Sequence, residues 1–284
     1  MKNILIVGSP RVGKTTLAKK IAKELGYVYI SLDSIFESIE KLNCWPYPKY
    51  SDANLISNEL SSFVINYLNN LDKEHRYVLE GAYLDIERIF PKLENINVIG
   101  LTYNKLDKNM LFNNIKKYDH NEWINKFNDN EILEKCECFI KRNNYYNDWF
   151  RKLNIKSYDW SSNYHEVMKE IISELKKEFI GEEIEIIIDR PIGSKHPTHD
   201  MIYEVNYGYI PNTKGSDNEE LDCYLLGINK SVSRYIGKCI GIIKRIDDDD
   251  DKLIVVPKNI NYTNEEIENL INFQEKYFKH ILIR

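Results

Sequence analysis

The chain contains near its start the stretch Gly8-Ser9-Pro10-Arg11-Val12-Gly13-Lys14-Thr15-Thr16. An apolar run at residues 4–7 comes before it, and residues 17–25 follow with the apolar spacing that is typical of a helix. The sequence therefore predicts a strand, a glycine loop and a helix. This is the context in which the pattern G-x-x-x-x-G-K-[ST] binds phosphate groups.

The loop has the chemistry needed to hold a nucleoside triphosphate. Its glycines permit backbone angles that turn successive N–H groups towards one point, and the N-terminus of the helix adds a partial positive charge. Lys14 can reach the β- and γ-phosphates, and the Thr15 hydroxyl can bind Mg²⁺. We therefore predict ATP and Mg²⁺ as cofactors. The residues expected to bind them are Gly8, Pro10, Arg11, Val12, Gly13, Lys14, Thr15 and Thr16.

Length and composition favour a globular protein with two domains. The chain has 284 residues, of which 43% are hydrophobic and 29% are charged. No segment approaches the roughly 18 apolar residues of a membrane span, and no signal segment precedes the first strand. We therefore expect a cytoplasmic protein with no membrane partner.

Charge and cysteine content narrow the function further. The net charge is −5, and residues 181–284 hold 13 Lys and Arg against 19 Asp and Glu. Because no basic stripe stands out, a nucleic-acid partner is not expected. The acidic excess favours cation binding or a solvated surface. The five cysteines are scattered and odd in number, which indicates reduced thiols.

Strands alternate with helices through the first part of the chain. Strands are expected at residues 27–30, 77–81, 96–102 and 155–158, and helices at 54–70, 106–117, 130–150 and 163–178. This alternation predicts an α/β domain with a parallel sheet and helices on both faces. Ligands of such sheets bind at the carboxyl ends of the strands, where the glycine loop, Asp33 and Glu80 are expected.

The glycine loop and the segments 32–37, 79–81 and 158–162 resemble the small P-loop kinases of the adenylate-kinase and shikimate-kinase type. The resemblance covers about residues 1–178. It implies that Asp33 contacts the phosphoryl acceptor or the water shell of the metal, and that Glu80 holds the acceptor or the metal's water. Two alternatives stay open: Asp33 could cap a helix, and Glu80 could be a surface acid at the end of a strand.

These kinases use arginines from a lid to hold the transferred phosphoryl group. Residues 104–151 are rich in Lys and Asn and contain only Arg142 and Arg151 as arginines. We assign Arg142 to substrate binding, with a solvated helix residue as the alternative. The sequence does not identify the phosphoryl acceptor.

The pattern changes at Gly181. Short strands are expected at 184–188, 222–227, 238–245 and 253–256, and the next helix only at 264–278. This predicts a small, mainly β, OB-like barrel with a C-terminal helix. The expected domains are 1–180 and 181–284.

Two acidic groups stand out in the second domain. One is Asp217-Asn218-Glu219-Glu220-Leu221-Asp222, and the other is the run of aspartates at 247–251 that precedes Lys252. Oxygen ligands of this kind suit Mg²⁺ or Mn²⁺, and two such ions could flank a phosphoryl group. A solvated hairpin loop is the alternative for the aspartate run.

Together with the segments 206–211, 253–257 and 273–277, these acidic groups resemble the soluble inorganic pyrophosphatases. The resemblance spans about residues 184–280. It implies that Glu219 deprotonates the attacking water. It further implies that the metal ligands are Asp217, Asp222, Asp247 and Asp250, and that phosphate oxygens are held by Lys252, Tyr207, Tyr277 and Lys195.

Three departures from that family affect the substrate. The segment between Lys195 and Asn206 is short, so the central arginine of the family lacks a clear counterpart. Glu219 stands in the place of an aspartate, and Phe278 stands where the family has a lysine. Because fewer cations hold the substrate, either pyrophosphate or a larger phosphoanhydride fits.

The combined prediction is a bifunctional enzyme. One domain is expected to be an ATP- and Mg²⁺-dependent kinase of a nucleotide or small metabolite, and the other a Mg²⁺-dependent pyrophosphatase-like hydrolase. The alternative is a nucleotide-binding regulator in which one or both domains are inactive. The sequence gives no indication of the oligomeric state.

Overall fold

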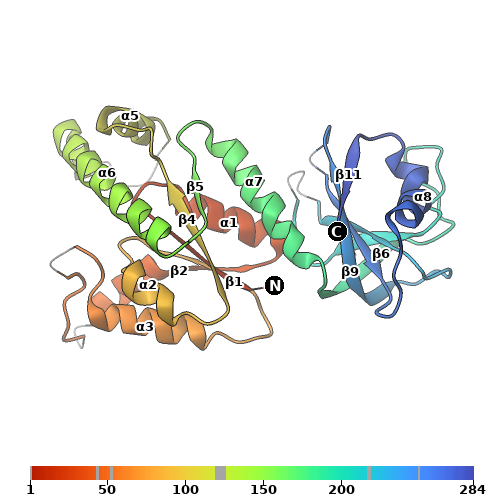
Figure 1. Ribbon diagram of the computed structural model, residues 1–284, viewed down its shortest axis with the longest axis horizontal. Helices are drawn as coiled ribbons and strands as arrows, with labels where there is room; N and C mark the ends of the chain where they lie inside the picture. Colours follow the sequence, from red (N-terminus) through yellow and green to blue (C-terminus); the bar gives the residue numbers. More distant parts are fainter. Residues whose placement is uncertain (1, 43–44, 52–53, 119–125, 216–218, 249) are drawn as a thin grey trace. The chain divides into compact units, whose positions relative to one another are not determined.

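The computed structural model describes residues 2–42, 45–51, 54–118, 126–215, 219–248 and 250–284 (Figure 1). Its contacts divide the chain into two compact units. Residues 2–20 and 27–169 form the N-terminal unit, and residues 21–26 and 170–284 form the C-terminal unit. The domain limits 1–180 and 181–284 stay a prediction.

Strands and helices alternate through the first two-thirds of the chain. In chain order the elements are β1 (Asn3–Gly8), α1 (Lys14–Leu25), β2 (Val28–Ser31), α2 (Leu32–Lys41), α3 (Asn58–Asn69), β3 (Tyr77–Glu80), α4 (Ile86–Ile89), η1 (Phe90–Lys92), β4 (Ile96–Thr102), α5 (Lys108–Tyr118), α6 (Asp129–Lys152), β5 (Ser157–Asp159), α7 (Tyr164–Lys176) and η3 (Lys177–Phe179).

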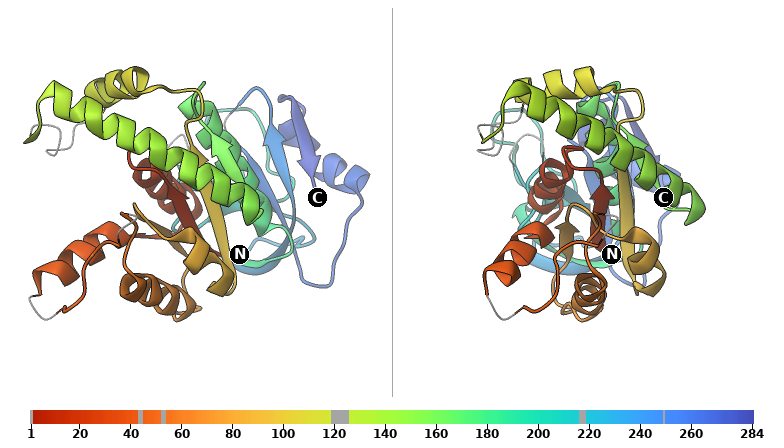
Figure 2. Two further views of the ribbon diagram at one scale, coloured as in Figure 1. Left: turned by 60° about the vertical axis from the view of Figure 1, so that its left-hand side comes forward. Right: turned by 90° about the vertical axis from the view of Figure 1, so that its left-hand side faces the viewer.

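The sheet of the N-terminal unit has the order β2-β3-β1-β4-β5, and every neighbouring pair is parallel. Helices lie on both of its faces (Figure 2). Leu5 and Val7 of β1 join one buried cluster with Val64 of α3 and with Tyr146 and Phe150 of α6. The predicted α/β fold is therefore confirmed, and β1 is the central strand that delivers the glycine loop.

Side chains at the helix starts set the limits of several elements. Ser31 caps α2 and Ser57 caps α3, each by accepting a backbone N–H three residues later. A full capping box between Asn128 and Glu131 starts α6. The helix expected at 54–70 therefore begins only at Asn58, because the serine before it ends the extended segment.

The C-terminal unit is mainly β. Its strands and helix are β6 (Glu183–Arg190), β7 (Asn206–Ile210), β8 (Leu221–Leu225), β9 (Arg234–Arg245), β10 (Lys252–Val256), α8 (Asn264–Glu275) and β11 (His280–Ile283).

The strands of this unit close into a barrel. They follow the order β10-β8-β7-β6-β9, and β9 also pairs with β10, which closes the barrel. Strand β11 pairs with β9 as well. The β10–β8 pair is parallel, and the other pairs are antiparallel. Ile267, Ile271 and Phe273 of α8 pack into the same buried cluster as Tyr224 and Ile254. The predicted barrel with a C-terminal helix is confirmed.

Within the described part of the chain, no helix combines the length and the apolar character that a bilayer crossing requires.

Candidate active sites

The glycine loop lies between the end of β1 and the start of α1, as its sequence predicts. Gly13 has φ of +83°, and a Cβ atom there would lie 2.7 Å from the ring of Tyr164. The Tyr164 hydroxyl donates to the Gly13 carbonyl at 2.9 Å. Both the backbone angle and the close ring require glycine at this position.

Lys14 is buried beside the loop that carries it. Its ammonium donates to the carbonyls of Gly8 at 3.1 Å and Ser9 at 2.9 Å. Burial lowers the pKa of Lys14, and the carboxylates of Asp33 and Glu80 oppose that shift. Two acids therefore act electrostatically on the ammonium of the loop, at the carboxyl edge of a parallel sheet.

Asp33 and Glu80 are both fixed by hydrogen bonds rather than free in solvent. Both oxygens of Asp33 accept the Ala82 N–H, at 2.9 and 3.1 Å. The helix cap is Ser31, so the cap alternative for Asp33 is wrong. Glu80 is 3% exposed and accepts from the Tyr29 hydroxyl at 2.9 Å, so the surface alternative is wrong as well.

The phenol of Tyr29 keeps its proton for this contact. Burial and the Glu80 carboxylate raise the pKa of Tyr29 to about 12. A protonated phenol is an obligate partner for a buried carboxylate near neutral pH, because an unpaired buried charge is costly. Tyr29 therefore holds Glu80 in place at the end of β3.

Arg142 lies on α6 against aromatic rings. Its guanidinium carbon is 5.9 Å from the centre of the Tyr83 ring and 5.5 Å from that of Tyr145, and one nitrogen is 3.5 Å from the Asn54 carbonyl. A cavity of about 240 Å³ opens beside it. The assignment of Arg142 to substrate binding stays a prediction, now with a cavity beside the residue.

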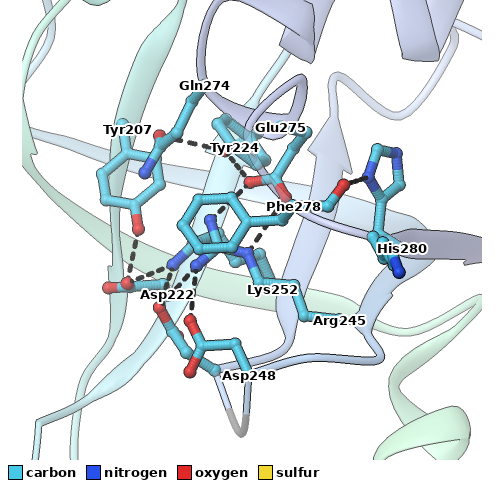
Figure 3. A network of polar contacts seen from close by, with 12 residues as sticks. Tyr207, Asp222, Tyr224, Arg245, Asp248, Lys252, Gln274, Glu275, Phe278 and His280 are labelled. Carbon is cyan, nitrogen blue, oxygen red and sulfur yellow. Dashed lines mark hydrogen bonds and ion pairs between the residues drawn. The ribbon is translucent and has the colours of Figure 1, made fainter.

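The second site centres on Lys252, at the start of β10 (Figure 3). Its ammonium is 1% exposed and donates to Asp222 at 2.8 Å and to Asp250 at 2.6 Å. The Tyr207 hydroxyl donates to the same oxygen of Asp222. Burial raises the pKa of Asp222, and Lys252 counteracts that shift. Two of the predicted metal ligands and two of the predicted phosphate-binding residues therefore meet here.

Arg245 of β9 extends this network, and it is not among the site residues expected from the sequence. Two of its nitrogens donate to the two oxygens of Glu275, at 3.0 and 2.7 Å. A third donates to Asp248 at 3.1 Å and to Asp250 at 3.2 Å. The guanidinium also stacks 3.5 Å from the centre of the Phe278 ring. Figure 3 shows Asp248, Glu275 and Phe278 gathered around Arg245.

Glu275 is the anchor of this second cation. It has no exposed surface and accepts from Tyr224 as well as from Arg245. A signal for Arg245 does exist in the sequence, because the period of two along β9 places it on the same buried face as Ile243. A charge on a buried strand face requires a buried partner of opposite sign.

The other predicted residues of this site lie elsewhere or are exposed. Both oxygens of Asp247 accept the Lys279 N–H at 3.2 Å, so this carboxylate caps a turn. Glu219 and Lys195 are exposed, and Tyr277 is 69% exposed. Asp217 falls outside the described residues.

The carboxylates of the second site supply only part of the ligand set that a divalent cation requires. Asp222 and Asp250 already share one positive charge, that of Lys252, so both carboxylates can face a common cation. Among the residues whose placement is described, no group of three His, Cys, Asp or Glu side chains gathers as a metal site would require. Asp251 is not available as a third acid, because it pairs with Lys176 at 2.9 Å. The solvated-loop alternative therefore fails for Asp250 and Asp251.

Comparison with known proteins finds different relatives for the two parts of the chain. A family model described as inorganic pyrophosphatase matches residues 159–282. An inorganic pyrophosphatase of Saccharolobus solfataricus is 31% identical over 120 residues, which are 38% of this chain and 67% of that protein. The chain belongs to the inorganic pyrophosphatase family through this region. A pyrophosphatase of Rickettsia felis is 28% identical over 116 residues, and this chain spans 64% of its length.

The N-terminal part of the chain is similar to P-loop kinases. A family model described as ATPase family associated with various cellular activities (AAA) matches residues 4–111. An adenylate kinase of Rickettsia bellii is 26% identical over 157 residues, which are 48% of this chain and 71% of that protein. The predicted resemblance to a P-loop kinase fused to a pyrophosphatase is confirmed.

Solved structures with a detectable likeness include proteins of both kinds. A pyrophosphatase from Helicobacter pylori is 17% identical with a TM-score of 0.30, and the match covers 36% of this chain and 85% of that one. A gluconokinase from Sinorhizobium meliloti is 15% identical with a TM-score of 0.42, and the match covers 62% of this chain and 93% of that one.

Proposed function

We propose that the chain is a bifunctional enzyme with an ATP-dependent kinase site and a Mg²⁺-dependent phosphoanhydride hydrolase site. The observation that carries the hydrolase is the convergence of Asp222 and Asp250 on one buried cation, Lys252. The observation that supports the kinase is the buried Lys14 ammonium, held by the carbonyls of Gly8 and Ser9 within the field of the Asp33 and Glu80 carboxylates. The substrates are proposals of ours for this chain.

At the kinase site, the loop N–H groups and Lys14 would hold the transferred phosphoryl group. Thr15 is exposed at the start of α1, where its hydroxyl would bind Mg²⁺ beside the phosphates. Asp33 would orient the acceptor, because its carboxylate is held rigidly by the Ala82 N–H. Charge stabilisation and positioning supply most of the catalysis in such phosphoryl transfers.

At the hydrolase site, Asp222 and Asp250 would hold Mg²⁺, together with Asp217. When bound, the metal would withdraw charge from a phosphoryl oxygen and acidify a bound water. Lys252 and Tyr207 would donate to phosphate oxygens, and Glu219 would accept a proton from the attacking water. Arg245 would keep Asp250 in place, because it donates to that carboxylate while Glu275 fixes its other nitrogens.

Removal of divalent cations is expected to abolish hydrolysis of pyrophosphate. Excess EDTA should stop orthophosphate release from pyrophosphate, because the two carboxylates and the substrate would repel each other without a metal between them. Orthophosphate release by the full chain is the measurement, and addition of Mg²⁺ beyond the EDTA should restore it. Hydrolysis that continues unchanged in EDTA would contradict the metal assignment.

Replacement of Lys14 by Ala is expected to weaken ATP binding by about 10- to 100-fold. The ammonium makes charged hydrogen bonds to phosphate, each worth roughly 1.5–3 kcal/mol. Isothermal titration of ATP·Mg²⁺ into the full chain measures the effect. Lys41→Ala removes an exposed lysine from the end of α2 and serves as the matched control. Equal affinity in both variants would contradict the assignment of the loop.

A nucleotide-binding regulator is the second candidate, and one observation favours it. The cations Lys252 and Arg245 already neutralise part of the acidic set, which leaves fewer carboxylates for metal. A regulator would bind ATP at Lys14 with no ATP consumption and no orthophosphate release. Only the presence of both activities, each abolished by its own site variant, excludes a regulator in which one or both domains are inactive.

A further inference from the structure

The cavity beside Arg142 is built from three separate segments of the N-terminal unit. The loop after α2, the turn after β3 and the middle of α6 contribute to its wall. The lining residues are Tyr50, Asn54, Tyr83, Cys138, Phe139 and Arg142. Its volume of about 240 Å³ lies below the range of about 300–1,000 Å³ of pockets for drug-sized ligands, so its occupant is small.

Two residues of the cavity wall are close in the chain or in space to groups that would carry out phosphoryl transfer. The Ser9 hydroxyl of the glycine loop donates to the Phe139 carbonyl at 2.7 Å. On the other side, Asp33 accepts from Ala82, the residue before Tyr83. The phosphate loop and the acid therefore each contact the chain at, or next to, a residue that lines the cavity.

The walls of the cavity suit a flat ring. Tyr50 and Tyr83 meet edge to face with their ring centres 5.5 Å apart, and the Arg142 guanidinium lies over Tyr83. Phe139 adds a third aromatic side chain. Aromatic faces and a planar guanidinium stack on rings, and the guanidinium also donates to ring carbonyl and nitrogen acceptors.

Two residues of the wall have an unfavourable backbone conformation. Asn54 and Tyr83 have φ values of +54° and +61°, and for a bulky residue such as Tyr this is rare. The Tyr83 carbonyl is held in this conformation by the Ile56 N–H at 2.9 Å. Strained residues of this kind concentrate at ligand sites, where the surrounding structure determines their position.

Negative charge close to the cavity favours a hydroxyl over a phosphate as the group that accepts the phosphoryl group. Asp33 accepts the N–H of Ala82, next to Tyr83. Burial raises the pKa of Tyr50 and Tyr83, and the Asp33 carboxylate adds to both shifts, so its negative charge acts on the wall of the cavity. A phosphate group beside Asp33 would be repelled by this carboxylate. A hydroxyl would instead donate a hydrogen bond to Asp33.

We propose that this cavity is the acceptor site of the kinase and that its occupant is a nucleoside, a ring-bearing compound that accepts phosphate on a sugar hydroxyl. The hydroxyl oxygen forms a bond to the γ-phosphorus of ATP while the bond from that phosphorus to the β,γ-bridging oxygen breaks. The hydroxyl proton passes to Asp33, and ADP leaves. This inference rests on the proposed kinase function.

The test measures ADP release by the full chain with ATP·Mg²⁺ and three sets of acceptors: nucleosides, their 5′-monophosphates, and ringless sugar acids. Nucleosides are expected to react at least 10-fold faster, in kcat/KM, than the other two sets. Faster transfer to monophosphates or sugar acids, or no transfer to any nucleoside, overturns the inference. ATP binding is measured separately by titration, so loss of the proposed function is distinguished from failure of this inference.

Substitutions in the wall of the cavity test whether the acceptor binds there. Arg142→Gln and Tyr50→Leu are each expected to raise KM for the nucleoside by at least 10-fold and to leave the Kd of ATP unchanged. Tyr50 is 41% exposed, so its replacement tests the wall without disturbing the core. Arg151→Gln removes an exposed arginine from the same helix as Arg142 and is the matched control. Unchanged nucleoside KM in both wall variants would also overturn the assignment.

Discussion

Replacement of Arg245 by Met is expected to destabilise the barrel by about 3–5 kcal/mol, because the change leaves a buried carboxylate without its cation. Glu275 has no exposed surface, and Arg245 is its bidentate partner at 2.7 and 3.0 Å. The methionine fills much of the same volume, so the loss of charge dominates over the loss of packing. The same change also frees Asp250 from one of its two cations.

Hydrogen exchange in peptides from β8, β9 and β10 measures this loss in the full chain, because it reports the free energy of opening locally. Arg234→Met is the matched control, since Arg234 pairs with Glu185 on the surface and such pairs contribute less than about 1 kcal/mol. A second replacement, Glu275→Leu, should recover most of the lost stability. Equal protection in the Arg245 and Arg234 variants would contradict the buried ion pair.

Replacement of Asp222 by Asn is expected to lower kcat for pyrophosphate hydrolysis by at least about 100-fold. Residues that only support metal ligands already cost roughly 10- to 100-fold when they are changed, and Asp222 would contact the metal itself. The amide keeps the shape of the carboxylate, so Lys252 and Tyr207 stay close to their places. Orthophosphate release at saturating Mg²⁺ is the measurement.

Glu265→Gln provides the control for Asp222→Asn. Glu265 is an exposed acid in the first turn of α8, so its neutralisation changes the net charge by the same amount away from the network. Hydrolysis by the Glu265 variant should equal that of the wild type. A similar small decrease in both variants would mean that Asp222 holds no metal.

Much of the fold follows from patterns that can be read directly in the sequence. The continuous apolar run of β1, the glycine loop and the helix after it are predicted because a central parallel strand is buried on both faces. Strand β4 at Ile96–Thr102 is predicted for the same reason. The switch from long helices to short strands likewise predicts the barrel.

Strand β7 is not among the strands expected from the sequence, and the reason is physical. It contains Gly208, and glycine in a strand interior weakens any prediction of a strand. In the structure a Cβ atom at this position would lie 1.9 Å from the Ile187 carbonyl oxygen, so only glycine permits the pairing with β6. A contact between distant segments therefore decides an element that local propensity opposes.

The site residues also include some that the sequence predicts and some that it does not. The approach of Lys14, Asp33 and Glu80 could be predicted because Asp33 and Glu80 lie at strand ends and Lys14 follows the loop after β1, and parallel strands bring those ends together. Arg245 and Glu275 could not be paired from the sequence, because 30 residues separate them and only the closed barrel brings α8 to β9. The assignment of Asp247 rests on spacing alone, and its contact with the Lys279 N–H gives that assignment no support.

The most direct test compares both activities in two variants of the full chain, Lys14→Ala and Asp222→Asn. Because one polypeptide would hold two independent phosphate sites, Lys14→Ala should lose acceptor-dependent ADP release and keep pyrophosphate hydrolysis. Asp222→Asn should show the reverse. Loss of both activities in either variant, or the absence of both from the wild type, would contradict the account.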